Sequence, residues 1–82
     1  MVTEKIRTCL TNSKNHKINR QLLAFCREPK NYDDLRKNWK DKRTLFDSIV
    51  ELKKAGGLLV DAGKYYATEE ALNVLSEYEK VK

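Results

Sequence analysis

The sequence has few of the residues that carry covalent or metal chemistry. Its 82 residues include two cysteines, Cys9 and Cys26, and a single histidine, His16. Both cysteines fall among apolar residues at helical spacing, which favours buried, reduced thiols over a disulfide framework. His16 lies in a polar run without a paired carboxylate or serine, and these three residues lack the ligand spacing of a zinc site. We therefore expect no enzymatic activity, no metal and no other cofactor.

Glycine is scarce, and so are long apolar runs. Gly56-Gly57 and Gly63 are explained by a helix stop and a turn, so they do not indicate a phosphate-binding loop or a small-molecule ligand. No stretch approaches the roughly 18 apolar residues that span a membrane, and residues 1–7 lack the apolar core of a secretory signal. These absences predict a cytoplasmic protein. The length allows one hydrophobic core but not two, which predicts a single domain over residues 1–82.

Positive charge is unevenly distributed along the chain. The net charge is +5, but residues 1–43 carry 12 Lys or Arg against 5 Asp or Glu, whereas residues 44–82 carry 5 against 7. The basic half can approach a polyanion such as nucleic acid. Solvated lysines give the same excess, so charge alone leaves both interpretations open.

Apolar periodicity predicts helices over residues 2–12, 17–27, about 32–39 and 42–55, and a last helix that follows Thr68 and reaches Glu79 or beyond. Asp41 and Thr68 are the expected N-caps of the last two. In the second helix the expected apolar face is formed by Ile18, Leu22, Phe25 and Cys26. After Gly56-Gly57 the period changes, and residues 58–61 and 64–67 predict two short strands in a β-hairpin. The fold class is therefore α+β, mostly α.

A short helix, a tight turn and a longer helix follow one another in the middle of the chain. Tyr32-Asp33-Asp34-Leu35 looks like the first helix of a helix-turn-helix, and Trp39-Lys40-Asp41-Lys42 looks like its turn. Residues 42–55 look like a recognition helix, and residues 58–67 look like a two-stranded wing. Over residues 17–79 the chain resembles the winged helix-turn-helix of small MarR-, ArsR- and PadR-like regulators from archaea, bacteria and viruses, with an extra N-terminal helix over residues 1–12. The resemblance implies a transcriptional regulator that binds double-stranded DNA.

The expected DNA face follows from the helical period. At about 100° per residue, Leu45, Phe46, Ile49, Val50 and Leu52 form the apolar arc of helix 42–55, which leaves Arg43, Thr44, Asp47, Ser48, Glu51 and Lys54 outward. The predicted DNA-binding residues are Arg36, Lys37, Lys40, Lys42, Arg43, Thr44, Ser48, Lys54 and Lys64. Asp47 and Glu51 argue against DNA binding, because phosphates repel carboxylates. Trp39 and Phe46 are interpreted as core residues.

Two alternatives accompany this interpretation. A winged helix can also be a protein-interaction module, in which Phe46, Asp47 and Glu51 would help to form the docking surface. Apolar stripes on the first and last helices suggest a homodimer, whose interface would contain Val2, Ile6, Cys9, Val74, Tyr78 and Val81, with a disulfide between the two copies of Cys9 as a further option. Packing of the first helix on the last within one chain would bury the same stripes.

Overall fold

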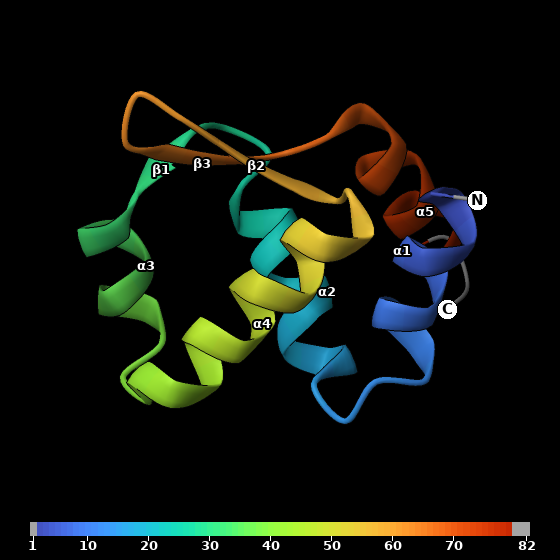
Figure 1. Ribbon diagram of the computed structural model, residues 1–82, viewed down its shortest axis with the longest axis horizontal. Coiled ribbons are helices and arrows are strands. Elements are labelled where there is room, and N and C mark those ends of the chain that lie inside the picture. Colours follow the sequence, from blue (N-terminus) through green and yellow to red (C-terminus); the bar gives the residue numbers. More distant parts are fainter. Residues whose placement is uncertain (1, 80–82) are drawn as a thin grey trace.

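The computed structural model describes residues 2–79, and Figure 1 shows its helices packed beneath a small sheet. The helices are α1 (Val2–Thr11), α2 (His16–Phe25), α3 (Tyr32–Asn38), α4 (Lys42–Ala55) and α5 (Glu69–Glu79), and the strands are β1 (Lys30–Asn31), β2 (Leu58–Asp61) and β3 (Lys64–Ala67). The predicted α+β class is confirmed. Helix α2 starts one residue earlier than expected. It ends at Phe25, two residues earlier than expected and four residues before Pro29. Whatever follows Glu79 lies outside the described residues.

Strand β1 is the one described element that the sequence analysis missed. It pairs antiparallel with β3, with Lys30 opposite Tyr65, which gives the sheet order β1-β3-β2. Two residues are too few to show an alternating pattern, so periodicity could not reveal this strand. Asn31 is also the N-cap of α3: its side chain accepts a hydrogen bond from the Asp34 N–H at 2.8 Å, while the Asp34 carboxylate accepts one from the Asn31 N–H. The hairpin is thereby fixed to the start of α3.

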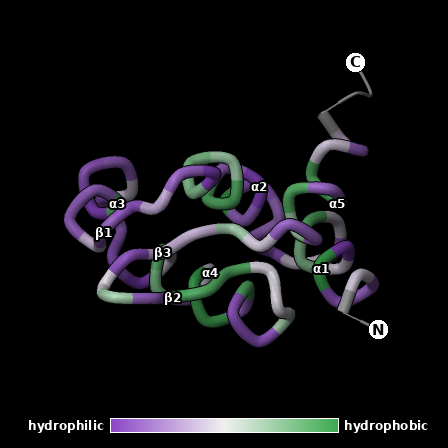
Figure 2. Tube along the Cα trace, turned by 90° about the horizontal axis from the view of Figure 1, so that it is seen from above, coloured by the Kyte–Doolittle hydropathy of each residue, from purple (hydrophilic) through white to green (hydrophobic). Residues whose placement is uncertain are grey.

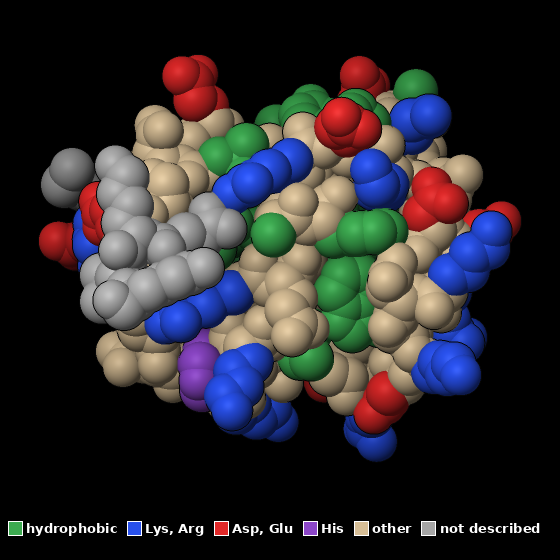
Figure 3. Space-filling model, turned by 180° about the vertical axis from the view of Figure 1, so that it is seen from behind, with side chains coloured by type: hydrophobic (Ala, Val, Ile, Leu, Met, Phe, Trp, Pro, Cys, Tyr) green, Lys and Arg blue, Asp and Glu red, His purple; other side chains and the backbone are tan. Residues whose placement is uncertain are grey.

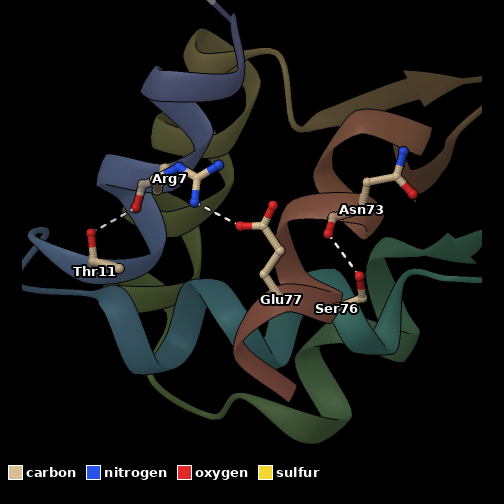
Figure 4. A network of polar contacts seen from close by, with 5 residues as sticks. All are labelled: Arg7, Thr11, Asn73, Ser76 and Glu77. Carbon is tan, nitrogen blue, oxygen red and sulfur yellow. Dashed lines mark hydrogen bonds and ion pairs between the residues drawn. The ribbon is translucent and has the colours of Figure 1, made fainter. Parts of the chain in front are cut away.

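Helix α1 packs inside its own chain, against α2, α4 and α5. Ile6 and Leu10 are fully buried, and the Arg7 guanidinium forms an ion pair with Glu77 on α5 at 2.6 Å (Figure 4). The structure thus has the alternative in which the first helix packs on the last within one chain, and the homodimer stays a prediction. Ile6, Cys9 and Val74 are buried within one chain, and Tyr78 is half-buried beneath the Arg20 guanidinium. The remaining members of the predicted dimer interface, the side chain of Val2 and residue Val81, lie outside what the structure describes.

The buried face of α2 differs from the expected one. Leu22 and Cys26 are buried as predicted, but Ile18 and Phe25 are only half-buried. Leu23 and the polar Asn19 are fully buried instead. The reason is that α2 contacts both α4 and α5, so its covered arc is turned toward the Asn19 side. The two hydrogens of its Nδ2 have acceptors, which are described below, whereas its Oδ1 is buried without a partner among the described residues.

The two adjacent glycines at the end of α4 have different roles. Gly56 ends the helix in the left-handed conformation, with φ 82°, and the Gly57 N–H donates a hydrogen bond to the Leu52 carbonyl at 2.8 Å. A Cβ on Gly57 would lie 3.4 Å from the Ala71 Cβ and 3.5 Å from the Ile6 Cγ1. Gly57 therefore lets the start of the wing approach α1 and α5 closely.

Both predicted N-caps are confirmed. The Thr68 hydroxyl accepts a hydrogen bond from the Ala71 N–H at 3.2 Å and begins α5, and Asp41 caps α4. The tip of the hairpin is tight: Ala62 and Gly63 both have positive φ, at 53° and 77°. This two-residue connection matches the right-handed twist of the strands on either side.

The buried thiols make stability depend on pH. Burial raises the pKa of Cys9 and of Cys26 to about 11, whereas an unfolded thiol ionises near about 8.5. The folded state therefore holds these protons more tightly, so the stabilisation is complete below about pH 8.5 and is lost as the pH rises toward 11. We expect the difference in Tm between the wild type and Cys26→Ala to shrink over that range. A difference that stays constant from pH 8 to pH 11 would contradict this linkage.

Candidate nucleic-acid interface

Asp41 starts helix α4 and is held in place by several hydrogen bonds. Its carboxylate accepts from the Thr44 hydroxyl at 2.8 Å and from the N–H groups of Arg43 and Thr44 at 3.1 and 3.3 Å. The Thr44 hydroxyl bond, together with the backbone bonds, holds the pKa of Asp41 below its ordinary range. Thr44 is half-buried, and its hydroxyl serves this cap. These hydrogen bonds therefore fix the N-terminal turn of α4, from which the Arg43 side chain projects.

The outward side of α4 only partly matches the expectation. Lys42, Arg43, Asp47 and Lys54 are exposed as predicted. Ser48 is a correction, because it is fully buried and its Oγ has no hydrogen-bond partner among residues 2–79. The buried residues of α4 are Leu45, Ser48, Ile49, Leu52 and Ala55, an arc that faces the contacts with α1 and α2. Ser48 lies within that arc, between Ala55 and Leu52 around the helix, so its buried hydroxyl cannot reach a groove of DNA.

Two aromatic residues predicted to be core behave differently. Trp39 is half-buried and meets the Phe25 ring edge-on, with ring centroids 5.5 Å apart. Phe46 instead has a side chain that is 59% exposed, which corrects its assignment to the core. Phe46 lies about 100° around the helix from Leu45, on the side away from Ser48. The buried arc was therefore placed too far toward Phe46 in the sequence analysis.

Glu51 is drawn inward and engaged by the rest of the chain. Its Oε1 accepts hydrogen bonds from the Asn19 Nδ2 at 2.7 Å and from the Ser13 hydroxyl at 2.8 Å. The same Asn19 amide donates to the Cys9 carbonyl at 2.8 Å. Two donors thus stabilise the carboxylate at a half-buried position. Of the two acidic residues expected to oppose DNA, Asp47 is exposed, whereas Glu51 is half-buried and its carboxylate is hydrogen-bonded within the chain.

Basic side chains surround this face. Exposed cations that form no ion pair with a described residue are found on α3, the following turn, α4 and the hairpin: Lys37, Lys40, Lys42, Arg43, Lys53, Lys54 and Lys64. Arg36 differs from them, because it is half-buried and its Nη1 is buried with no hydrogen-bond partner in the described part of the chain. Arg36 is therefore less available for a phosphate than the sequence suggested.

Lys14 joins this set, although sequence reasoning did not find it. It lines a surface groove together with Asn15, Phe46, Asp47, Val50, Glu51 and Lys54. Lys14 lies in a polar turn without periodicity, so only the folding of α1 and α2 brings it beside α4. The outward face of α4 therefore has cations near both ends.

The arrangement of helices gives the molecule two distinct faces. Figure 2 shows α4 and β2 along one side and α2 along the opposite side. On the opposite face, in Figure 3, hydrophobic side chains gather in the middle, and a shallow groove there is lined by Gln21, Ala24, Phe25, Asn38 and Trp39. Helix α5, with exposed Glu69, Glu70 and Glu77, lies at the other end of the molecule from α3 and the hairpin tip (Figure 1).

Other kinds of site are not evident in the described part of the chain. Among residues 2–79, no three His, Cys, Asp or Glu side chains are grouped so that they could hold a metal ion. None of the described helices has the length and apolar character needed to cross a membrane. Comparison of the chain with family models, with curated proteins and with solved structures gives no match.

Removal of the Glu51 carboxylate should destabilise the fold. Glu51→Ala leaves the Ser13 hydroxyl and one hydrogen of the Asn19 amide without their partner, and a charge-assisted hydrogen bond contributes about 1.5 to 3 kcal/mol. We expect a loss of that size in the free energy of unfolding, measured with urea. Glu51→Gln retains an acceptor oxygen and should lose clearly less. Equal losses in the two variants would mean that Glu51 stabilises by packing alone.

Proposed function

We propose that this chain is a winged helix-turn-helix protein that binds double-stranded DNA and regulates transcription by occupying its site. Helix α4 is the recognition helix, and the β2–β3 hairpin is the wing. The observation that carries the proposal is the set of exposed cations around the outward face of α4 that form no ion pair with a described residue. Lys40 and Lys42 lie at the start of α4, Lys54 near its end and Lys64 on the wing. Such a set of cations is best suited to bind the backbone phosphates of DNA.

The topology supports a wing that moves together with the helix pair. Strand β1 leads directly into α3 and pairs with β3, where Asn31 lies opposite Lys64. Lys64 also lies opposite Asp61 of β2, at the end of the hairpin. The wing is thus anchored on one side to α3 and on the other, through Gly57, to α1 and α5. A fixed wing lets α4 and Lys64 engage neighbouring parts of one duplex.

The dimensions of α4 suit the major groove. Its 14 residues give a length of about 21 Å, and the groove admits one α-helix. Helices of this kind place their N-terminal residues against the base edges. Arg43 is exposed there and can donate two hydrogen bonds to a guanine, while Asp47 can accept one from a cytosine amino group.

A protein-interaction module is the second candidate, and the exposure of Phe46 favours it. In that case the groove bordered by Phe46, Val50 and Lys14 would receive a protein rather than a nucleic acid. Glu51 also lines that groove, but its carboxylate already accepts hydrogen bonds from Ser13 and Asn19. Salt dependence separates the two functions, because phosphate contacts release counterions.

DNA binding is tested by fluorescence anisotropy with random and enriched duplexes at two salt concentrations. If Lys40, Lys42, Lys54 and Lys64 each neutralise one phosphate, the slope of log affinity against log salt should be about −3.6. Lys64→Ala should weaken binding to all sequences alike and reduce that slope by about 1. No binding at about 50 mM salt would exclude the proposed function and favour the protein-interaction module.

A second variant tests base recognition, and a third serves as the matched control. Arg43→Ala should cost about 1 to 3 kcal/mol on the enriched duplex and much less on random DNA, if Arg43 contacts a guanine. An equal loss on both would make Arg43 a phosphate contact. Lys17→Ala removes the same charge from an exposed position of α2, which belongs neither to the recognition helix nor to the wing, and should leave affinity and slope nearly unchanged.

A further inference from the structure

Phe46 has the most exposed large hydrophobic side chain in the described part of the chain, at 59%. Four other aromatic residues form ring pairs: Phe25 meets Trp39, and Tyr32 meets Tyr65. The Phe46 ring has no such partner among the described residues. It projects from the fifth residue of α4, within the half of the helix that the proposed function places nearest to the bases.

The surroundings of Phe46 combine a small apolar spot with positive charge. Val50 lies one turn further along α4, and both side chains border the groove. Its other lining residues are Lys14, Asn15, Asp47, Lys54 and Glu51, whose carboxylate is hydrogen-bonded by Ser13 and Asn19. Arg43 is exposed one turn before Phe46. An apolar centre with cations on either side is complementary to a base edge that carries a hydrocarbon group and is flanked by phosphates.

Thymine supplies such a group. In the major groove its C5-methyl distinguishes it from the other unmodified bases, and apolar side chains including Phe contact that methyl. Resting on the proposed function, we propose that Phe46, supported by Val50, recognises the 5-methyl group of thymine. Phe46 is then a specificity-determining residue between Arg43 and Lys54, and the preferred sites contain thymine at a fixed distance from the base that Arg43 contacts.

The size of the apolar spot favours this ligand over a protein. A standard protein interface buries about 800 Å² on each partner, whereas one Phe side chain contributes at most about 250 Å². Val50 is already half-buried, so it adds little to the Phe46 contribution. The cations around the spot would also lose their water in a protein interface, at a cost that a partner without matching acidic groups cannot offset. A methyl group flanked by phosphates needs only a small apolar contact, and the phosphates can pair with the surrounding cations.

The test compares thymine with uracil, which pairs identically with adenine but lacks the methyl. A duplex that the protein enriches from a random pool is made in two forms, one with thymine and one with deoxyuridine, and anisotropy gives the affinity for each. Burial of one methyl group corresponds to about a fourfold difference. We expect the wild type to prefer the thymine duplex by that factor for each methyl contacted, and Phe46→Ala to show a ratio near one.

Ile18→Ala is the matched control, because Ile18 is a half-buried apolar residue of α2, outside the recognition helix and the wing, and it should keep the wild-type ratio. Circular dichroism melts establish that each variant folds. A wild-type ratio of one with intact DNA binding would overturn the thymine inference and leave the proposed function standing. A ratio that survives Phe46→Ala would overturn the role of Phe46. Absence of DNA binding by folded wild type would overturn both.

Discussion

The hydrogen bonds of the Asn19 side-chain amide hold together the three helices on which the rest of the structure depends. One amide hydrogen goes to the Cys9 carbonyl on α1 and the other to the Glu51 carboxylate on α4, while Asn19 itself is fully buried on α2. Both bonds are short, and one acceptor is charged, so they are strong where water is excluded. Because a buried donor without a partner is costly, this junction favours the observed rotation of α4 relative to α1 and α2.

That rotation decides which chemistry faces outward. It turns Ser48 into the core and Phe46 into solvent, and it engages Glu51 with Ser13 and Asn19. The outward face is therefore less acidic and more apolar than the helical period alone indicated. The same junction places the turn after α1, with Lys14, beside the C-terminal half of α4. The charge distribution of the candidate interface is thus a consequence of a hydrogen-bonded junction on the other side of the helix.

Sequence reasoning succeeded where a local rule was sufficient. The boundaries of α4 and the hairpin, and the caps at Asp41 and Thr68, follow from side-chain chemistry within a few residues, and the structure has them. It failed where contacts between distant segments determine strand pairing or burial. Strand β1 exists because β3 lies beside it, and Asn19 is buried because Cys9 and Glu51 supply acceptors. Of the candidate site, the exposed cations were predictable, whereas Ser48, Phe46 and Lys14 required the rotation of α4 and the path of the preceding turn.

The position of α1 has a consequence for where the folding unit ends. Residues 17–79 contain every element that resembles a winged helix, yet Ile6 and Leu10 of α1 are fully buried in the common core, and Cys9 supplies one of the two acceptors of the Asn19 amide. A fragment limited to residues 17–79 would expose apolar surface and leave one hydrogen of the Asn19 amide without its acceptor. The segment with the helix-turn-helix pattern is therefore shorter than the cooperative folding unit. Grafting the motif onto another protein would require α1 to be included.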